Sequence, residues 1–155
     1  MKLVALNAKD KKVILTRLKD DFGFDTKLDY HLFRHTTDDK LYLMSTAVNE
    51  IDLSKLNVNS LGLYFAAYHA DSGEIRLSIE GSQVIGPHAT KGVIRLPKDI
   101  FDRWMMGQDI PTDETESKYV LIQNEKGDYF GTGRIKEGEI LNFVPKARRI
   151  KNIAE

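Results

Sequence analysis

Three alternating apolar segments follow one another closely near the C-terminus, at about residues 119–124, 128–136 and 139–144. Apolar side chains at every second position are typical of half-buried β-strands. Only the short turn-forming stretches EKGD and EG separate the three segments. A chain with strands this close together is expected to form a compact β-rich unit at this end.

The same unit begins with a shorter strand and one helix. Residues 93–96 predict the strand, and Pro97 opens a helix at about 98–106 that Gly107 ends. The only tryptophan of the sequence, Trp104, falls within this helix. Its neighbours are apolar, and we expect Trp104 to lie on the buried face of the helix.

The first part of the chain mixes helix and strand. Apolar residues at three- and four-residue steps predict a helix at 7–22, with Asn7 as its N-cap and Gly23 at its end. Further on, the pattern predicts strands at 30–35 and 41–45 and a short helix within 46–53. It then predicts a hairpin formed by 61–69 and 74–85.

These patterns predict an α+β protein with two parts. We expect a mixed α/β domain over residues 1–90 and a small β-barrel-like domain with one helix over residues 91–155. No Ser-, Gly- or Pro-rich linker separates the two, and the domains should therefore pack against each other.

Composition narrows the possible functions. The sequence has 155 residues, no cysteine and a formal net charge of +0. The absence of cysteine excludes thiol chemistry and fits a reducing compartment, and no apolar run is long enough for a membrane helix. These features predict a cytoplasmic location. The balanced charge argues against coating nucleic acid by bulk electrostatics and leaves binding through a local patch open.

Two glycines interrupt the strand at 128–136. Glycine weakens a strand, and strand alternation would place Gly131 and Gly133 on the same face. One interpretation is structural: the glycines form a bulge or a tight corner of a small barrel. The other is functional: the two bare positions let a sugar-phosphate backbone lie against the strand. The residues alone leave both interpretations open.

Basic residues gather after these glycines. From residue 134 to 155 there are six basic and three acidic residues, whereas from 101 to 128 there are three basic and seven acidic. Such polarisation suits the orientation of an anionic ligand, and arginine both grips phosphate and stacks on bases. If extended geometry persists past Pro145, Arg148 shares strand parity with Lys146 and is favoured over Arg149 as the RNA contact.

The second part of the chain resembles a PUA domain, the RNA-binding pseudo-barrel of pseudouridine synthases and archaeosine transglycosylases. The resemblance is carried, in order, by VIRL at 93–96, MGQDI at 106–110, YVLI at 119–122, GTGR at 131–134 and VPKARR at 144–149. It implies that RNA contacts the basic face. Together with the glycines and the last basic residue, the candidate RNA-binding set is Gly131, Gly133, Arg134, Lys146, Arg148, Arg149 and Lys151.

The first part resembles a pre-PUA domain through LGLYF at 61–65, IRLS at 75–78 and QVIGPHA at 83–89. A pre-PUA plus PUA pair is similar to the Nip-seven family of large-ribosomal-subunit biogenesis factors, especially its short archaeal members. The resemblance implies a non-catalytic protein that binds rRNA or tRNA and contacts assembly or RNA-processing proteins through the first domain. Because a similar pair ends some RNA cytosine-5 methyltransferases, a targeting subunit acting in trans for an RNA-modifying enzyme is the alternative.

The sequence offers only weak evidence for an enzyme. His31 and His35 have the spacing of a zinc pair, but that pair needs a helix and a third ligand. Ordinary strand histidines are therefore the favoured interpretation, and we expect no metal, no cofactor and no catalytic residue. Tyr64, Phe65 and Tyr68 could stack bases, with Tyr64 and Tyr68 on one face, although core packing or a protein contact is favoured.

Overall fold

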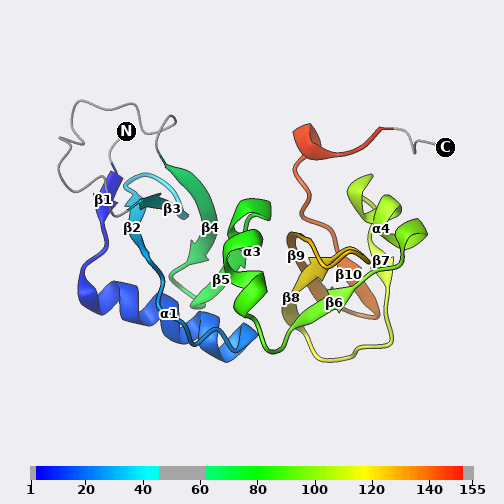
Figure 1. Cartoon of the computed structure of the whole chain (residues 1–155), viewed down its shortest axis with the longest axis horizontal. Coiled ribbons are helices and arrows are strands. Elements are labelled where there is room, and N and C mark those ends of the chain that lie inside the picture. Colours follow the sequence, from blue (N-terminus) through cyan, green and yellow to red (C-terminus); the bar gives the residue numbers. More distant parts are fainter. Residues whose placement is uncertain (1–2, 46–61, 152–155) are drawn as a thin grey trace.

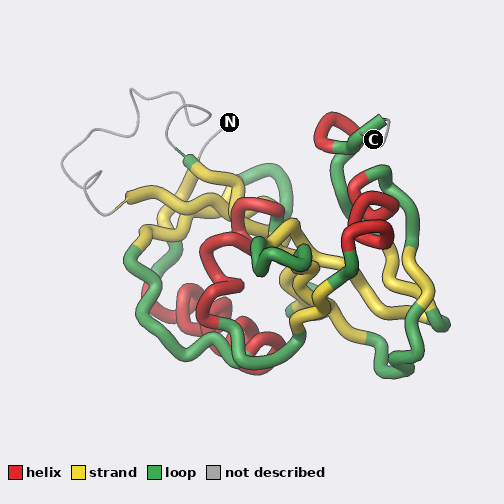
Figure 2. Tube along the Cα trace, turned by 45° about the vertical axis from the view of Figure 1, so that its right-hand side comes forward, coloured by secondary structure: helices red, strands yellow, loops and turns green. Residues whose placement is uncertain are grey.

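A computed structural model describes residues 3–45 and 62–151 of the chain (Figure 1). Two five-stranded sheets lie side by side, and helix α3 stands between them (Figures 1 and 2). The expected helix within 46–53 falls outside the described residues. Among the described helices, none is long and apolar enough to cross a membrane.

The first sheet is entirely antiparallel and has the strand order β1-β2-β3-β4-β5. Its strands are β1 (Leu3–Ala5), β2 (Tyr30–His35), β3 (Lys40–Ser45), β4 (Leu63–His69) and β5 (Glu74–Leu77). The strands expected at 30–35 and 41–45 are confirmed, whereas the sequence pattern does not predict β1. A strand of only three residues carries too little alternation to be recognised in the sequence.

Helix α1 (Ala8–Phe22) covers one face of the first sheet (Figure 1). Its predicted caps are confirmed: the Asn7 side chain accepts a hydrogen bond from the Asp10 N–H at 2.8 Å, and Gly23 adopts φ 67°. The helix buries three side chains at three- and four-residue steps against the sheet: Ile14, Leu18 and Phe22.

Helix α3 (Ile79–Ile85) replaces the second half of a predicted strand. The alternation predicts one extended run over 74–85, but the strand ends at Leu77. Ser78 caps the helix, because its hydroxyl accepts a hydrogen bond from the Gly81 N–H at 2.9 Å and donates one to the Tyr64 carbonyl at 2.6 Å. Pro87 follows in a short 3₁₀ turn, η3 (Gly86–His88), that ends the helical stretch.

The second sheet has the strand order β6-β8-β9-β10-β7 and curls into a half-barrel. Its elements are β6 (Val93–Arg95), α4 (Lys98–Met105), β7 (Ile110–Pro111), β8 (Lys118–Gln123), β9 (Tyr129–Lys136), β10 (Glu139–Leu141) and the 3₁₀ turn η4 (Lys146–Arg148). Trp104 is fully buried in its core, as predicted. The expected α+β class with a pseudo-barrel in the second part is confirmed.

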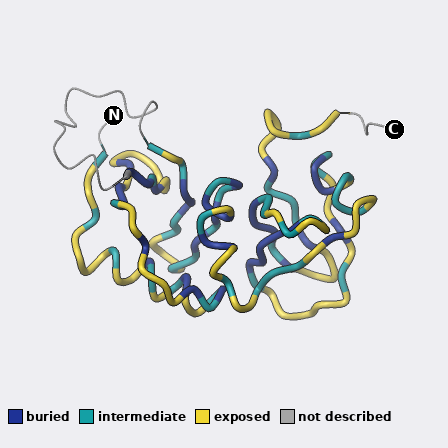
Figure 3. The backbone as a smooth tube through the Cα atoms, viewed as in Figure 1, coloured by how far each residue is buried: buried dark blue, intermediate teal, exposed yellow. Residues whose placement is uncertain are grey.

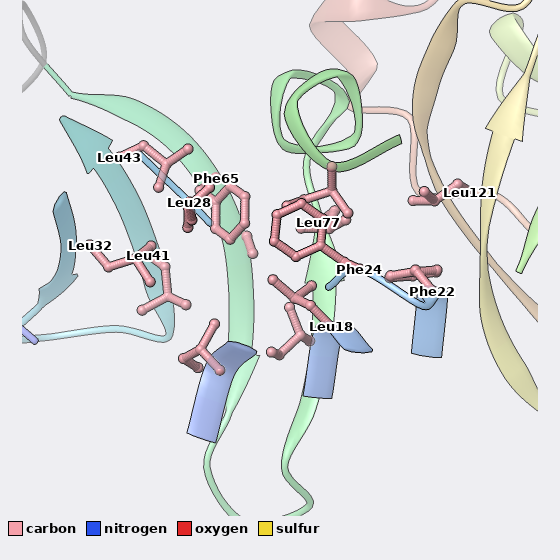
Figure 4. Close-up of a cluster of buried hydrophobic side chains, with 14 of the residues drawn as sticks. Leu18, Phe22, Phe24, Leu28, Leu32, Leu41, Leu43, Phe65, Leu77 and Leu121 are labelled. Atoms are coloured by element: carbon pink, nitrogen blue, oxygen red, sulfur yellow. The ribbon is translucent and has the colours of Figure 1, made fainter. Parts of the chain in front are cut away.

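The two sheets share a continuous interface through α3. The Gly131 N–H donates a hydrogen bond to the Ser82 hydroxyl at 2.8 Å, and the Thr132 hydroxyl donates one to the Leu77 carbonyl at 2.9 Å. Leu121 of β8 belongs to the same apolar cluster as Phe22 of α1 (Figure 4). Residues from both sheets therefore contribute to a single core at their junction.

Candidate nucleic-acid interface

A β-bulge at Gly131 changes the direction of the side chains along β9. Leu121 of β8 pairs with Thr132, but Gln123, two residues later, pairs with Tyr129, three residues earlier, so β9 holds one extra residue. Gly131 takes up this residue with φ 94°, a conformation that favours glycine. The bulge predicted as the structural interpretation of this strand is confirmed.

Because of the bulge, Gly131 and Gly133 face opposite sides, and the expectation that they share a face is wrong. A Cβ at Gly131 would lie 3.3 Å from Ile79 of α3, whereas one at Gly133 would lie 2.5 Å from Ile140 and 2.8 Å from Trp104. Both glycines are buried. Protein atoms thus occupy the places that a sugar-phosphate backbone would need, and close packing accounts for both bare positions.

Arg134, the next candidate along β9, is already paired within the protein. Its Nη1 donates to the Glu74 carboxylate at 2.8 Å, and its guanidinium lies 4.9 Å from the centre of the Tyr119 ring. The Tyr119 hydroxyl also donates to Glu74, at 3.2 Å. The hydrogen bond from Arg134 lowers the pKa of Glu74, and the same bond raises the pKa of Arg134.

This pairing predicts a pH dependence of stability. The folded-state pKa of Glu74 lies below its unfolded value, so ionised Glu74 stabilises the fold above the unfolded pKa and loses this effect as the pH falls through the folded pKa. We expect Glu74→Gln to cost about 1 kcal/mol near neutral pH, since both side chains remain about a quarter exposed, and less at an acid pH below the folded-state pKa of Glu74. Urea denaturation of the two proteins at both pH values measures the difference. A cost that stays constant or grows on acidification contradicts it.

The C-terminal basic residues lie on a 3₁₀ turn, not on an extended strand. After Pro145 the chain forms η4, and the parity argument that favoured Arg148 over Arg149 is therefore wrong. Arg148 donates to the Glu80 carboxylate of α3 at 2.5 Å. Arg149 folds back instead, and its Nε donates to the Val144 carbonyl at 3.0 Å. Next to it, the Ile150 N–H donates to the Met105 carbonyl at 2.8 Å and ties the segment to the end of α4.

Lys146 and Lys151 complete the candidate set. Both are exposed, and the segment that carries them lies largely at the surface (Figure 3). Neither forms an ion pair with any acidic residue of the parts 3–45 and 62–151. These two lysines are therefore available to an anion, whereas Arg134 and Arg148 are each already paired with a carboxylate.

Two carboxylates from the first part of the chain thus neutralise two arginines of the second. Glu74 comes from β5 and Glu80 from α3, and their partners come from β9 and η4. Counting charges along the C-terminal segment alone overestimates its free positive charge. No local pattern indicates these pairs, since each partner lies at least 60 residues away in the sequence.

A groove of about 140 Å³ lies where the two sheets meet. It is lined on one side by Tyr64, Arg76 and Glu80, and on the other by Phe143, Pro145 and Arg148. Arg76 was not among the predicted site residues. The alternation of Glu74, Ile75, Arg76 and Leu77 along β5 does place Arg76 on the polar face, and this is the signal that could have indicated it.

The histidine and aromatic candidates lie in the first sheet. His35 is buried, with Nδ1 at 2.9 Å from the Thr37 hydroxyl and 3.4 Å from Asp38. Within the described residues no group of three His, Asp or Glu side chains is arranged to hold a metal ion. Phe65 is buried in the core and Tyr68 packs against the same cluster, so Tyr68 does not share the outer face with Tyr64.

Comparison with known proteins identifies the second part of the chain. Residues 91–150 match the sequence model of a family described as the PUA domain of the methyltransferase RsmF. The chain therefore contains a PUA domain. No curated protein matches the sequence.

The fold is similar to a PUA-domain crystal structure from Aeropyrum pernix K1, solved as a tartrate complex. The TM-score is 0.52 at 14% sequence identity, and the match covers 86% of this chain and 71% of that one. At this identity the similarity concerns the fold alone.

Proposed function

We propose that the protein binds RNA without catalysing a reaction, and that its PUA domain makes the main contact. The observation that carries this proposal is the position of the basic segment 146–151. The segment lies at the surface of the part that matches a PUA domain, and Lys146 and Lys151 are exposed there. Lysine and arginine neutralise backbone phosphates, which supply most of the affinity for RNA that is independent of sequence.

The candidate residues take different parts in this proposal. Lys146, Arg148 and Lys151 contact phosphate, while Arg149 holds the segment against Val144. Arg134 reaches RNA only by leaving Glu74. Gly131 and Gly133 contribute by shaping β9 and do not contact RNA, since both are buried.

The finer proposal is a role in ribosome biogenesis, in rRNA processing or large-subunit assembly. It rests on the resemblance of the pre-PUA plus PUA pair to the Nip-seven family and on the division into residues 1–90 and 91–155. In this proposal the first domain contacts other assembly proteins while the PUA domain grips rRNA.

A second function is favoured by the family match. The matching family is the PUA domain of a methyltransferase, and a PUA domain that works beside such an enzyme would target it to RNA. The protein would then act in trans as the RNA-binding subunit of a modifying enzyme, on tRNA or rRNA.

Competition binding separates the two functions. A fluorescently labelled rRNA fragment bound to the full chain is titrated with unlabelled rRNA fragments and with tRNA at one salt concentration. Stronger competition by rRNA supports ribosome biogenesis, and stronger competition by tRNA supports the targeting of a tRNA-modifying enzyme. Crosslinking of the protein to RNA in cells then identifies the bound RNA directly.

Salt dependence tests the phosphate contacts. With three contacts to single-stranded RNA, log affinity should fall against log salt with a slope of about −2, which is roughly a twentyfold loss between 50 and 200 mM. The double variant Lys146→Ala, Lys151→Ala should reduce this slope to about −0.7. The control Lys9→Ala, Lys12→Ala removes the same charge from exposed positions on α1 and should keep the wild-type slope. Equal slopes in all three proteins would show that the basic segment does not contact phosphate.

A further inference from the structure

The groove between the two sheets combines aromatic rings with cations. Tyr64 from β4 and Arg76 from β5 face Phe143, which follows β10. The Arg76 guanidinium carbon lies 4.4 Å from the centre of the Phe143 ring, a stacking distance. Arg76 therefore lies against an aromatic ring at the wall of the groove.

Arg76 differs from the two other arginines at this junction. Arg134 is neutralised by Glu74 and Arg148 by Glu80, but Arg76 forms no ion pair with an acidic residue of the described parts of the chain. A guanidinium that lies against an aromatic ring without a carboxylate partner keeps its positive charge for a ligand. Arginine planes in such positions stack on unpaired RNA bases.

Aromatic rings continue on both sides of the groove. Tyr64 lies 5.8 Å from Tyr42 on one side, and Phe143 lies 6.3 Å from Tyr119, which is itself buried, on the other, measured between ring centres. Lys40 stands 5.8 Å from the centre of the Tyr64 ring. A series of rings accompanied by cations is the arrangement by which proteins bind single-stranded nucleic acid.

The size of the groove limits what can enter it. Its volume of about 140 Å³ is well below the ~300–1,000 Å³ of sites for drug-sized ligands. A cavity of about 150 Å³ accepts benzene, a single six-membered ring. An open groove of this size encloses one pyrimidine ring more fully than the two fused rings of a purine, which would extend beyond it.

We propose that this groove binds one unpaired pyrimidine nucleotide of single-stranded RNA. The base stacks on Arg76 and packs against Tyr64, and Arg148 at the rim exchanges Glu80 for the phosphate of the same nucleotide. The inference rests on the proposed RNA binding and adds a specificity: the first part of the chain supplies a base contact, while the PUA domain supplies the phosphate contacts. Arg76 calls for a flat ring and Arg148 for a nearby negative charge, and a nucleotide supplies both in one ligand.

Fluorescence anisotropy of the full chain with labelled ten-nucleotide oligo(U) and oligo(A) tests the groove. We expect the wild-type protein to bind oligo(U) several-fold more tightly than oligo(A). Arg76→Ala should weaken oligo(U) binding about tenfold, the effect of losing one stacking contact, and should remove most of the preference. Arg76→Lys keeps the charge without the plane and should recover little of either. The control Arg34→Ala removes an exposed arginine from β2 of the same sheet and should bind like the wild type.

The outcomes distinguish this inference from the proposed function. If the wild-type protein binds no RNA at all, both fail. If it binds but Arg76→Ala equals Arg34→Ala, or if Arg76→Lys keeps full affinity and preference, the groove does not stack a base and RNA binding itself stands. Tighter binding of oligo(A) would overturn the size argument. Melting curves of all variants accompany the titrations, and Arg76→Lys still decides the question if Arg76→Ala proves unstable.

Discussion

Trp104→Ala is expected to lower the free energy of unfolding by about 3–5 kcal/mol. The Trp104 side chain is fully buried in the core of the second sheet, among residues such as Ile135 and Ile140. Its removal leaves a cavity beneath α4 that the short helix and the neighbouring strands cannot fill. Typical domains are stable by about 5–15 kcal/mol, so this single change would remove a large part of the stability.

Urea denaturation of the full chain measures this loss, and the melting temperature should fall by roughly 10 °C. Trp104→Phe serves as the matched control. The indole Nε1 has no hydrogen-bond partner in the described structure, so the change to phenylalanine loses no hydrogen bond. It removes only part of the side-chain volume and should cost about 1 kcal/mol. Equal stability of the alanine and phenylalanine variants would contradict the tight packing of the core around Trp104.

Gly133→Val is expected to destabilise the protein by at least about 3 kcal/mol, at the upper end of the range for overpacked cores. Even a single Cβ at this position would lie 2.5 Å from Ile140 and 2.8 Å from Trp104, and valine adds two further methyl groups. Neither neighbour can move easily, since Trp104 and Ile140 are both buried. The folded fraction should retain its RNA affinity, because Gly133 lies inside the second sheet and does not face the ligand.

The control for this change is Gly138→Ala, in the turn between β9 and β10. Gly138 has φ 82°, but a Cβ added there would meet no atom within 4 Å, so alanine introduces backbone strain of about 1 kcal/mol without a clash. Thermal melts and RNA titrations of both variants decide between the two explanations of the glycines. A stable Gly133→Val protein with weakened RNA binding would restore the interpretation in which the bare strand faces a sugar-phosphate backbone.

Elements with strong local signals could be predicted from the sequence. Helix α1 has an N-cap at Asn7, a glycine at its end and apolar residues at helical spacing. Helix α4 likewise lies between Pro97 and Gly107. In both cases the residues that start and stop the helix directly flank it in the sequence, so their effect does not depend on the rest of the fold.

Helix α3 shows where such signals become ambiguous. The run from Glu74 to Ile85 alternates well enough to be one strand, yet it changes to a helix after Leu77. The deciding contact is tertiary: a Cβ at Gly81 would lie 2.1 Å from the Phe65 carbonyl oxygen, so only glycine lets α3 pack this closely on β4. Glycine usually weakens a helix, but here the close approach of the Phe65 carbonyl requires it.

Local residue patterns were enough to predict the α+β class, the close-set strands of the second part, the PUA resemblance and the basic segment at its end. All of these depend on residues close together in the chain. Which charges remain free depends on the packing of the two sheets, because Glu74 and Glu80 reach Arg134 and Arg148 across their junction. This packing also brought Arg76 to Phe143, 67 positions further along the chain by their residue numbers, and so formed the groove. Such pairs form when packing places distant segments side by side, and no local pattern in the sequence encodes that placement.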